Sequence, residues 1–417
     1  MFPNPLEYFN ETYLTILSRV FKYLAYAMPF ILVGLGWKMW VRHRNADWLS
    51  TLTWVMLEIK IPRDVYKTPL AMEMALGNAL SQAGGVGTNL KKYWQGRVIV
   101  WFSLEIVSTE GEIHFYIRTP IQFRNIIESQ LYAQYPQAEI FTVDDYVLKA
   151  IASMHEEEWD LWGCEQHLKK PDPYPIKTYV DYGLDKATTK IEEEAGLIDP
   201  ITGVLEWMGS MKKDEHVWVQ IMVRSSKNSH DKPGAFFGQK EDWKDKAKRE
   251  IDGIKAKYEG GADALEALGK KMKMTKLEQE TITAIERSLD KPAFDTGIRT
   301  IYLAKKNAYR GENVNGIVGL FRPYSSNNLN GFKIAHETDF DNPWQDFSGN
   351  KKVALKKHML EEYLERAYFY PPDSHHFFTL TAEEIATIYH FPGRVSTTPT
   401  FKRIESKKSE PPVNLPM

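Results

Sequence analysis

Residues 98–117 have the sequence VIVWFSLEIVSTEGEIHFYI, and this stretch decides the fold. It contains two runs rich in β-branched and aromatic side chains, which favour β-strands. Between the runs lies Ser108–Gly111, where glycine supplies the positive φ that a tight connection requires. The stretch therefore predicts an antiparallel hairpin.

The hairpin belongs to a larger unit that extends outward in both directions. Residues 54–61 alternate between β-branched and other side chains, as a half-buried strand does. Thr68-Pro69 and Thr119-Pro120 each combine a hydroxyl that can cap a helix with a proline that suits its first turn. Residues 138–143 supply a last strand. The order β-α-β-β-α-β predicts an α+β domain of the ferredoxin-like type over residues 50–150.

A second, looser version of this plan follows the first. Residues 160–335 again favour the order β-α-β-β-α-β, which predicts a second ferredoxin-like domain. The pattern is interrupted at residues 240–291, where lysine and acidic residues are interleaved with apolar ones at helical spacing. We expect solvated helices in this insertion, with a partner-docking arm as the alternative. C-terminal helices are predicted over residues 350–392, and an extended tail over residues 393–417.

The N-terminal segment, residues 1–45, contains the only membrane candidate. The uncharged run between Lys22 and Lys38 is shorter than the roughly 20 residues that a spanning helix needs. Flanking cations can snorkel along their stems, which extends the predicted transmembrane helix to about residues 14–41. An interfacial amphipathic helix and a buried soluble helix are the alternatives. The residues that mark the anchor are Tyr23, Pro29, Trp37 and Trp40.

Basic residues at the two ends of this helix predict its orientation. Lys38, Arg42 and Arg44 flank the C-terminal end, against two basic residues at the other end. This bias predicts a single-pass protein of the cytoplasmic (inner) membrane with its C-terminal bulk in the cytoplasm. The lone cysteine, Cys164, fits a reducing compartment because it cannot form an internal disulfide. The net charge of −2 provides no drive towards nucleic acid.

The face of the first sheet that points away from its helices is unusually aromatic. We expect an oligomer partner or the second domain to cover it, because such patches mark interfaces. A base-stacking platform for single-stranded nucleic acid is the alternative. Glu58 and Glu105 on the same face would repel phosphates, so nucleic acid is expected to be contacted only indirectly or weakly. The candidate partner-binding residues are Trp54, Trp101, His114 and Tyr116.

Motifs that carry chemistry are missing from the sequence. It contains neither the phosphate-binding pattern GxxxxGK[ST] nor the nucleophile pattern GxSxG. Cys164 and His167 have the spacing of two zinc ligands, but no second Cys/His pair completes a tetrahedral site. Asp373, His375 and His376 are interpreted as part of a turn, with a metal-dependent hydrolase as a minor alternative. We therefore predict no catalytic residue, no cofactor and no metal.

The C-terminal sequence resembles a known family. Residues 380–393, LTAEEIATIYHFPG, and residues 406–416, SKKSEPPVNLP, look like the segment that leads into the motor domain of HerA-like and type IV secretion (conjugative DNA-transfer) ATPases. Residues 102–140 resemble the pre-motor domain upstream of such bacterial ATPases, so the likeness covers most of the chain after the anchor. The landmarks are mostly apolar patterns.

This resemblance implies a function without a catalytic site. The chain stops at Met417, where the ATPase core of the family would begin, and no position matches the phosphate-binding motif. The resemblance therefore implies a non-enzymatic accessory or scaffold of a type IV secretion-like or DNA-transfer apparatus. It would dock a separate P-loop ATPase at the cytoplasmic face, and it could also self-associate.

Overall fold

The computed structural model describes residues 5–62, 67–85, 87–153, 158–185, 198–226, 230–231, 240–259, 274–340 and 342–392. The predicted C-terminal tail lies outside these residues. The chain divides into two compact units. The first contains residues 1–52 and 86–98, and the second contains residues 53–85 and 99–417.

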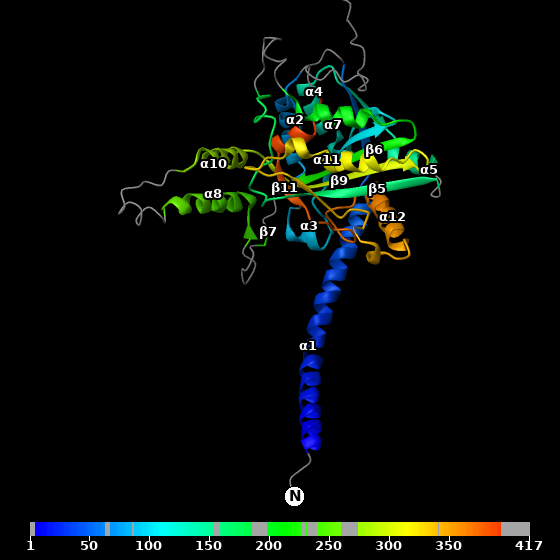
Figure 1. Ribbon diagram of the computed structural model, residues 1–417. Coiled ribbons are helices and arrows are strands. Elements are labelled where there is room, and N and C mark those ends of the chain that lie inside the picture. Colours follow the sequence, from blue (N-terminus) through cyan, green and yellow to red (C-terminus); the bar gives the residue numbers. More distant parts are fainter. Residues whose placement is uncertain are drawn as a thin grey trace, which may run out of the picture. The chain divides into compact units, whose positions relative to one another are not determined.

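The first unit consists of helix α1 (Pro5–Ser50) and the short helix α3 (Asn89–Tyr93) (Figure 1). Among the described residues, α1 is the one helix that is long and apolar enough to cross a membrane. Its apolar side chains from residue 19 to residue 40 are exposed. A helix of that kind is stable in lipid, because its backbone hydrogen bonds are made within the helix and its apolar side chains contact lipid tails.

The segment that contains α3 packs on the C-terminal part of α1. The rings of Trp37 and Tyr93 lie 6.1 Å apart, as do those of Trp40 and Trp94. The Arg44 Nε donates a hydrogen bond of 3.1 Å to the Trp94 carbonyl. Gly96 has a φ of 70°, and a Cβ there would overlap with the Arg44 carbonyl, so glycine permits this close approach.

The second unit is built on one antiparallel sheet of nine strands with the order β10-β5-β9-β6-β2-β3-β1-β4, and β11 pairs with β9. The strands are β1 (Trp54–Lys60), β2 (Trp101–Thr109), β3 (Glu112–Pro120), β4 (Glu139–Val143), β5 (Trp159–Leu168), β6 (Glu215–Ser225), β9 (Ala293–Lys305), β10 (Phe332–Ala335) and β11 (Phe378–Thr381). Strands β7 (His230–Asp231) and β8 (Lys240–Glu241) form a separate pair. The hairpin predicted from residues 98–117 is the β2–β3 pair.

The sheet has two halves with the same strand order. The first half is ordered β4-β1-β3-β2 and the second β10-β5-β9-β6. Strands β2 and β6 join the halves through a register that runs from Trp101 opposite Arg224 to Thr109 opposite His216. Without this pairing, each half would expose a long strand edge with unpaired backbone N–H and C=O groups, which promotes aggregation. The pairing of β2 with β6 satisfies these groups. The stretches predicted as two domains thus contribute their strands to one continuous sheet within one compact unit.

Helices cover both faces of this sheet (Figure 1). One face carries α2 (Pro69–Ser81), α4 (Arg124–Gln134), α7 (Pro200–Gly209), α11 (Gly311–Gly319) and α13 (Ala382–Ile388). The other face carries α5 (Tyr146–Ser153) and α12 (Asn350–Glu365). All residues of α13 are buried, and its first turn is a capping box between Thr381 and Glu384. The C-terminal section is therefore part of the core.

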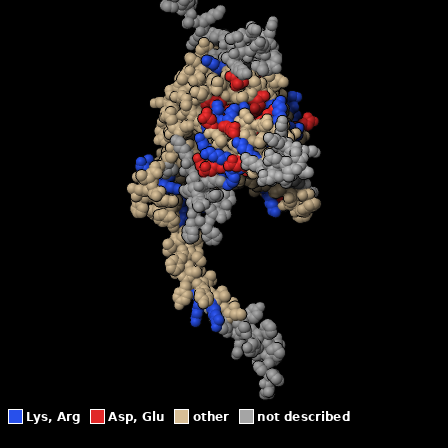
Figure 2. Space-filling model, turned by 90° about the vertical axis from the view of Figure 1, so that its left-hand side faces the viewer, with Lys and Arg blue, Asp and Glu red and all other residues tan. Residues whose placement is uncertain are grey.

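The predicted insertion contains α8 (Trp243–Glu259) and α10 (Lys276–Leu289). The two helices pack on each other through Ala247, Ile251, Ile254, Ile282 and Ile285. Figure 2 shows that lysine, arginine and acidic side chains are interspersed on the side of the molecule that carries these helices. We call α8 and α10 the arm.

Gly297 of β9 provides a stability test of the packing. A Cβ at this position would overlap with the ring of Tyr368, which is buried. We expect Gly297→Ala to lower the free energy of unfolding by about 1–3 kcal/mol, because a well-packed core resists added volume. Thermal and denaturant unfolding of the protein in detergent would measure the change.

Gly203→Ala in α7 is the matched control, since nothing lies within 4 Å of a Cβ there. Alanine should raise stability by up to about 1 kcal/mol at this helical position. Equal losses for the two variants would contradict the predicted contact between Gly297 and Tyr368.

Candidate functional site

A row of polar side chains crosses the sheet from β1 to β5. In register, Glu58 lies opposite Tyr116, and Tyr116 opposite Glu105. Glu105 then lies opposite Gln220, Gln220 opposite Arg299, and Arg299 opposite Glu165. Side chains directly opposite each other point to the same face of a sheet. We call these residues the polar row: Glu58, Tyr116, Glu105, Gln220, Arg299 and Glu165.

The polar row lies on the face that α5 and α12 cover, so its charges need partners. Arg366, just after α12, meets Glu105 with two hydrogen bonds, 3.0 Å from Nε to Oε1 and 3.1 Å from Nη2 to Oε2. Both side chains are fully buried. Arg366 also pairs with Asp145, and the Tyr146 hydroxyl donates a 2.8 Å hydrogen bond to Glu105. Burial alone would raise the pKa of Glu105, but Arg366 together with the hydroxyls of Ser103 and Tyr146 outweighs burial, so the pKa is lowered.

At the β5 end, two carboxylates and two cationic side chains form a closed ring. Arg299 Nη2 lies 3.2 Å from Glu165 Oε1 and 3.1 Å from Glu362 Oε2. His375 bridges the same carboxylates, with Nδ1 3.0 Å from Glu165 Oε1 and Nε2 2.6 Å from Glu362 Oε1. Burial would lower the pKa of His375, but the hydrogen bonds to the two carboxylates raise it to about 9. The pKa of Glu165 is lowered, because His167, His375 and Arg299 outweigh its burial.

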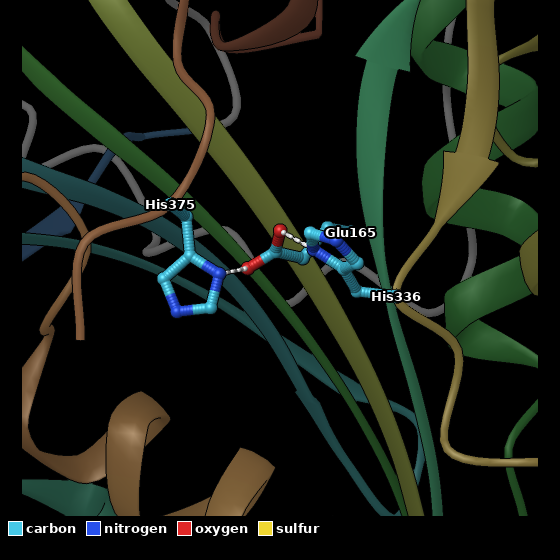
Figure 3. Close-up of side chains that lie close together, drawn as sticks. All are labelled: Glu165, His336 and His375. Carbon is cyan, nitrogen blue, oxygen red and sulfur yellow. Dashed lines mark hydrogen bonds and ion pairs between the residues drawn. The ribbon is translucent and has the colours of Figure 1, made fainter. Parts of the chain in front are cut away.

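Further histidines surround this ring. His336 Nδ1 lies 2.9 Å from Glu165 Oε2, and Figure 3 shows the Glu165 carboxylate between His336 and His375. His167, two residues after Glu165 on β5, places Nε2 3.7 Å from the same Oε2. The rings of His167 and His376 lie 5.2 Å apart. These side chains come from β5, from the turn after β10 and from the segment before β11.

The structure places the predicted partner-binding residues on the face of the polar row. Trp101 and Tyr116 are buried, each with 8% of its surface exposed, and Trp54 and His114 are half-buried. The chain's own α5, α12 and residues 366–377 cover this face, where the sequence led us to expect the second domain or an oligomer partner. Apart from α5, this cover comes from residues 350–377, which lie far away in the sequence, so local patterns could not predict it.

Two groups of side chains have donor atoms close enough to hold a metal ion. Glu165, His336 and His375 form the first, and His358, Glu362 and Asp373 form the second. His375 belongs to the stretch that the sequence predicts to be a turn. Cys164 and His167, which have zinc-like spacing, point to opposite faces of β5.

Sequence reasoning missed Glu165, Arg299, Glu362 and Arg366. A usable signal was present, because Glu165 and Arg299 interrupt strands that are otherwise largely apolar. A charge in such a position requires a buried partner. The partners lie far away in the sequence, so their identity could not be read locally.

Glu105→Gln tests the buried ion pair. The substitution leaves Arg366 buried with Asp145 as its remaining acidic partner. We expect the free energy of unfolding to fall by about 3–5 kcal/mol, because breaking a buried pair strands a charge. Glu128→Gln, which breaks the more exposed pair with Arg124 on α4, should cost less than about 1 kcal/mol.

The same pair predicts a pH dependence. Because the pKa of Glu105 in the folded protein lies below its ordinary value of 4.5, the pair stabilises the fold above that value. Its contribution is lost as the pH falls further, through the folded pKa. The stability difference between wild type and Glu105→Gln, measured by denaturant unfolding, should therefore shrink below pH 4.5. A difference that stays constant into strong acid would contradict the assignment.

Comparison with known proteins gives a family without an assigned activity. The chain matches the model of a domain of unknown function (DUF8128) over residues 100–403. None of the curated proteins matches it. The match contains the polar row apart from Glu58, together with the arm and the C-terminal residues that pair with the row. Because it covers more than half of the chain, the protein belongs to the DUF8128 family.

Proposed function

We propose that this protein is a non-enzymatic, membrane-anchored docking module of a type IV secretion-like or DNA-transfer apparatus. The observation that carries the proposal is α1, whose apolar side chains are exposed along the helix. Exposed apolar surface on this scale calls for a lipid or protein environment. The second unit stands on the cytoplasmic side of the membrane in this proposal.

The first unit supports that orientation. Trp37, Trp40, Tyr93 and Trp94 gather at the C-terminal part of α1, where an aromatic belt would lie at the membrane interface. Basic residues of α1 and of the α3 segment belong to the same part of the unit: Lys38, Arg42, Arg44, Lys91, Lys92 and Arg97. Excess positive charge of this kind favours the cytoplasmic side.

We infer further that each half of the sheet is a ferredoxin-like unit. The orders β4-β1-β3-β2 and β10-β5-β9-β6 place equivalent strands in equivalent positions. A helix follows the first and third strand of each half, namely α2, α4, α7 and α11. This plan agrees with the resemblance of the sequence to the pre-motor region of HerA-like and secretion ATPases.

The proposed partner is a separate HerA-like or secretion-type P-loop ATPase. The burial of Trp101 and Tyr116 weighs against the face of the polar row as a docking surface or as a stacking platform for single-stranded nucleic acid. The arm is the remaining candidate from the sequence analysis, and its interspersed charges suit a polar, specific contact (Figure 2). We assign the docking contact to the arm.

Capture of the ATPase tests this assignment. The full chain in detergent should retain a HerA-like ATPase encoded by the same genome when the two are co-expressed. Reversing the charge of two exposed arm residues, with Lys244→Glu and Lys248→Glu, should reduce capture at least tenfold. Lys212→Glu with Lys213→Glu, also exposed, should leave capture unchanged. A wild-type chain that purifies alone in the presence of the ATPase would remove the proposal.

A charge in the middle of α1 tests the anchor. Leu32 is 59% exposed, and an arginine at the centre of a spanning helix costs about 2.5–3.5 kcal/mol. We expect Leu32→Arg to move much of the protein from the carbonate-resistant membrane fraction into the soluble or degraded fraction. Leu148→Arg on α5 is the matched control, since Leu148 is 56% exposed but lies in the second unit. Equal membrane retention for both variants would contradict a spanning α1.

A further inference from the structure

The histidines around Glu165 converge like the ligands of a metal ion. Glu165, His336 and His375 each offer one donor atom, and these atoms lie within 4.8 Å of one another. Ligands of a tetrahedral ion at 2.0–2.1 Å lie roughly 3.4 Å apart. The separations between donor atoms would therefore shrink by up to about 1.4 Å, and the His336 side chain, 58% exposed, has room to move.

His167 lies beside this group of three and is the candidate for a fourth donor. Its Nε2 is buried, and no hydrogen-bond partner for it is present among the described residues. The atom lies 3.7 Å from Glu165 Oε2, too far for a hydrogen bond. Buried polar atoms without a hydrogen bond are rare and call for an explanation, and the 3.7 Å contact with Glu165 leaves this atom without one. A bound ion would explain this one, because Glu165 and His167 share a face of β5.

The surroundings resemble the outer shell of known metal sites. A metal-bound histidine usually gives its other ring nitrogen to a carboxylate, which fixes the ring. His375 does so here, with Nε2 2.6 Å from Glu362 Oε1. Arg299 holds Glu165 and Glu362 in place, at 3.2 and 3.1 Å. The carboxylates of Glu165 and Glu362 offset the charge of a divalent ion. The positive charge of Arg299 opposes the ion and lowers the affinity of the site for it.

We propose that Glu165, His167, His336 and His375 bind a divalent first-row transition metal ion, represented by Zn²⁺. Three neutral imidazoles and one carboxylate suit this class, whereas Ca²⁺ and Mg²⁺ prefer oxygen ligands. His375 becomes a ligand by releasing the Nδ1 proton that it shares with Glu165, so binding releases a proton to solvent. Four protein donors close the coordination sphere, as in structural sites. The ion would tie β5 and the turn after β10 to the segment before β11.

Zinc titration of the full chain tests the site. The protein is purified in detergent through a histidine-free tag, stripped with a chelator and titrated with Zn²⁺ alone by calorimetry. We expect one ion per chain, a rise in Tm on binding, and visible bands of tetrahedral coordination when Co²⁺ is used. His336→Ala should weaken binding at least tenfold and abolish the rise in Tm. Because the His336 side chain is 58% exposed, we expect this variant to fold like the wild type.

His114→Ala is the matched control. His114 Nδ1 contacts a glutamate of the polar row, Glu58, at 2.8 Å, so the variant also removes a His–Glu pair from this face. It should bind Zn²⁺ like the wild type. Equal affinity of His336→Ala and wild type, or less than one ion per chain, would overturn the proposal. Loss of the ion in His358→Ala but not in His336→Ala would also overturn it, by moving the ion to the second group.

Discussion

The bidentate contact between Arg366 and Glu105 is the constraint on which the second unit depends. Glu105 lies at the middle of the sheet, where β2 meets β6, and it is fully buried. A carboxylate in that position is tolerated only with a partner of matching geometry. Arg366 is also fully buried, and it brings the end of α12 onto the junction of the two halves. This ion pair thus ties the cover of the sheet to the strand at which the two halves join.

The C-terminal part of the second unit completes both faces of the sheet. Residues 350–377 cover the polar row through α12 and the segment that follows it. Immediately afterwards, β11 pairs with β9 and α13 is buried on the opposite face. We expect contacts of such large sequence separation to slow folding, because closing long loops costs entropy. The matched family segment, residues 100–403, includes this whole region.

Local patterns predicted most elements but not their assembly. The hairpin at residues 98–117, the start of α2 at Thr68-Pro69 and the apolar α1 depend on neighbours in sequence, which local patterns report directly. The helix start predicted at Thr119-Pro120 was wrong, because these residues end β3 and α4 begins at Arg124. The β2–β6 pairing has no such signal, because either strand could equally have remained an edge. The charges at Glu165 and Arg299 were visible, but Glu362 and His375 lie more than 60 residues beyond Arg299. The candidate site was therefore the part least accessible to sequence reasoning.

The polar row explains why so many charges are retained in a core that apolar residues could fill. Side chains alternate along a strand, so a slip of one residue moves a whole set to the other face. A slip between β2 and β6 would turn Glu105 or Gln220 towards the face that packs on α2 and α7, away from Arg366 and Arg299. Because the row extends over six adjacent strands, a slip at any of its five pairings meets the same penalty. Buried polar groups used in this way select one register, as a single buried asparagine does in a coiled coil. The polar row therefore helps to specify the strand register across both halves. Arg366, Glu362 and His375 supply the buried partners of its charges.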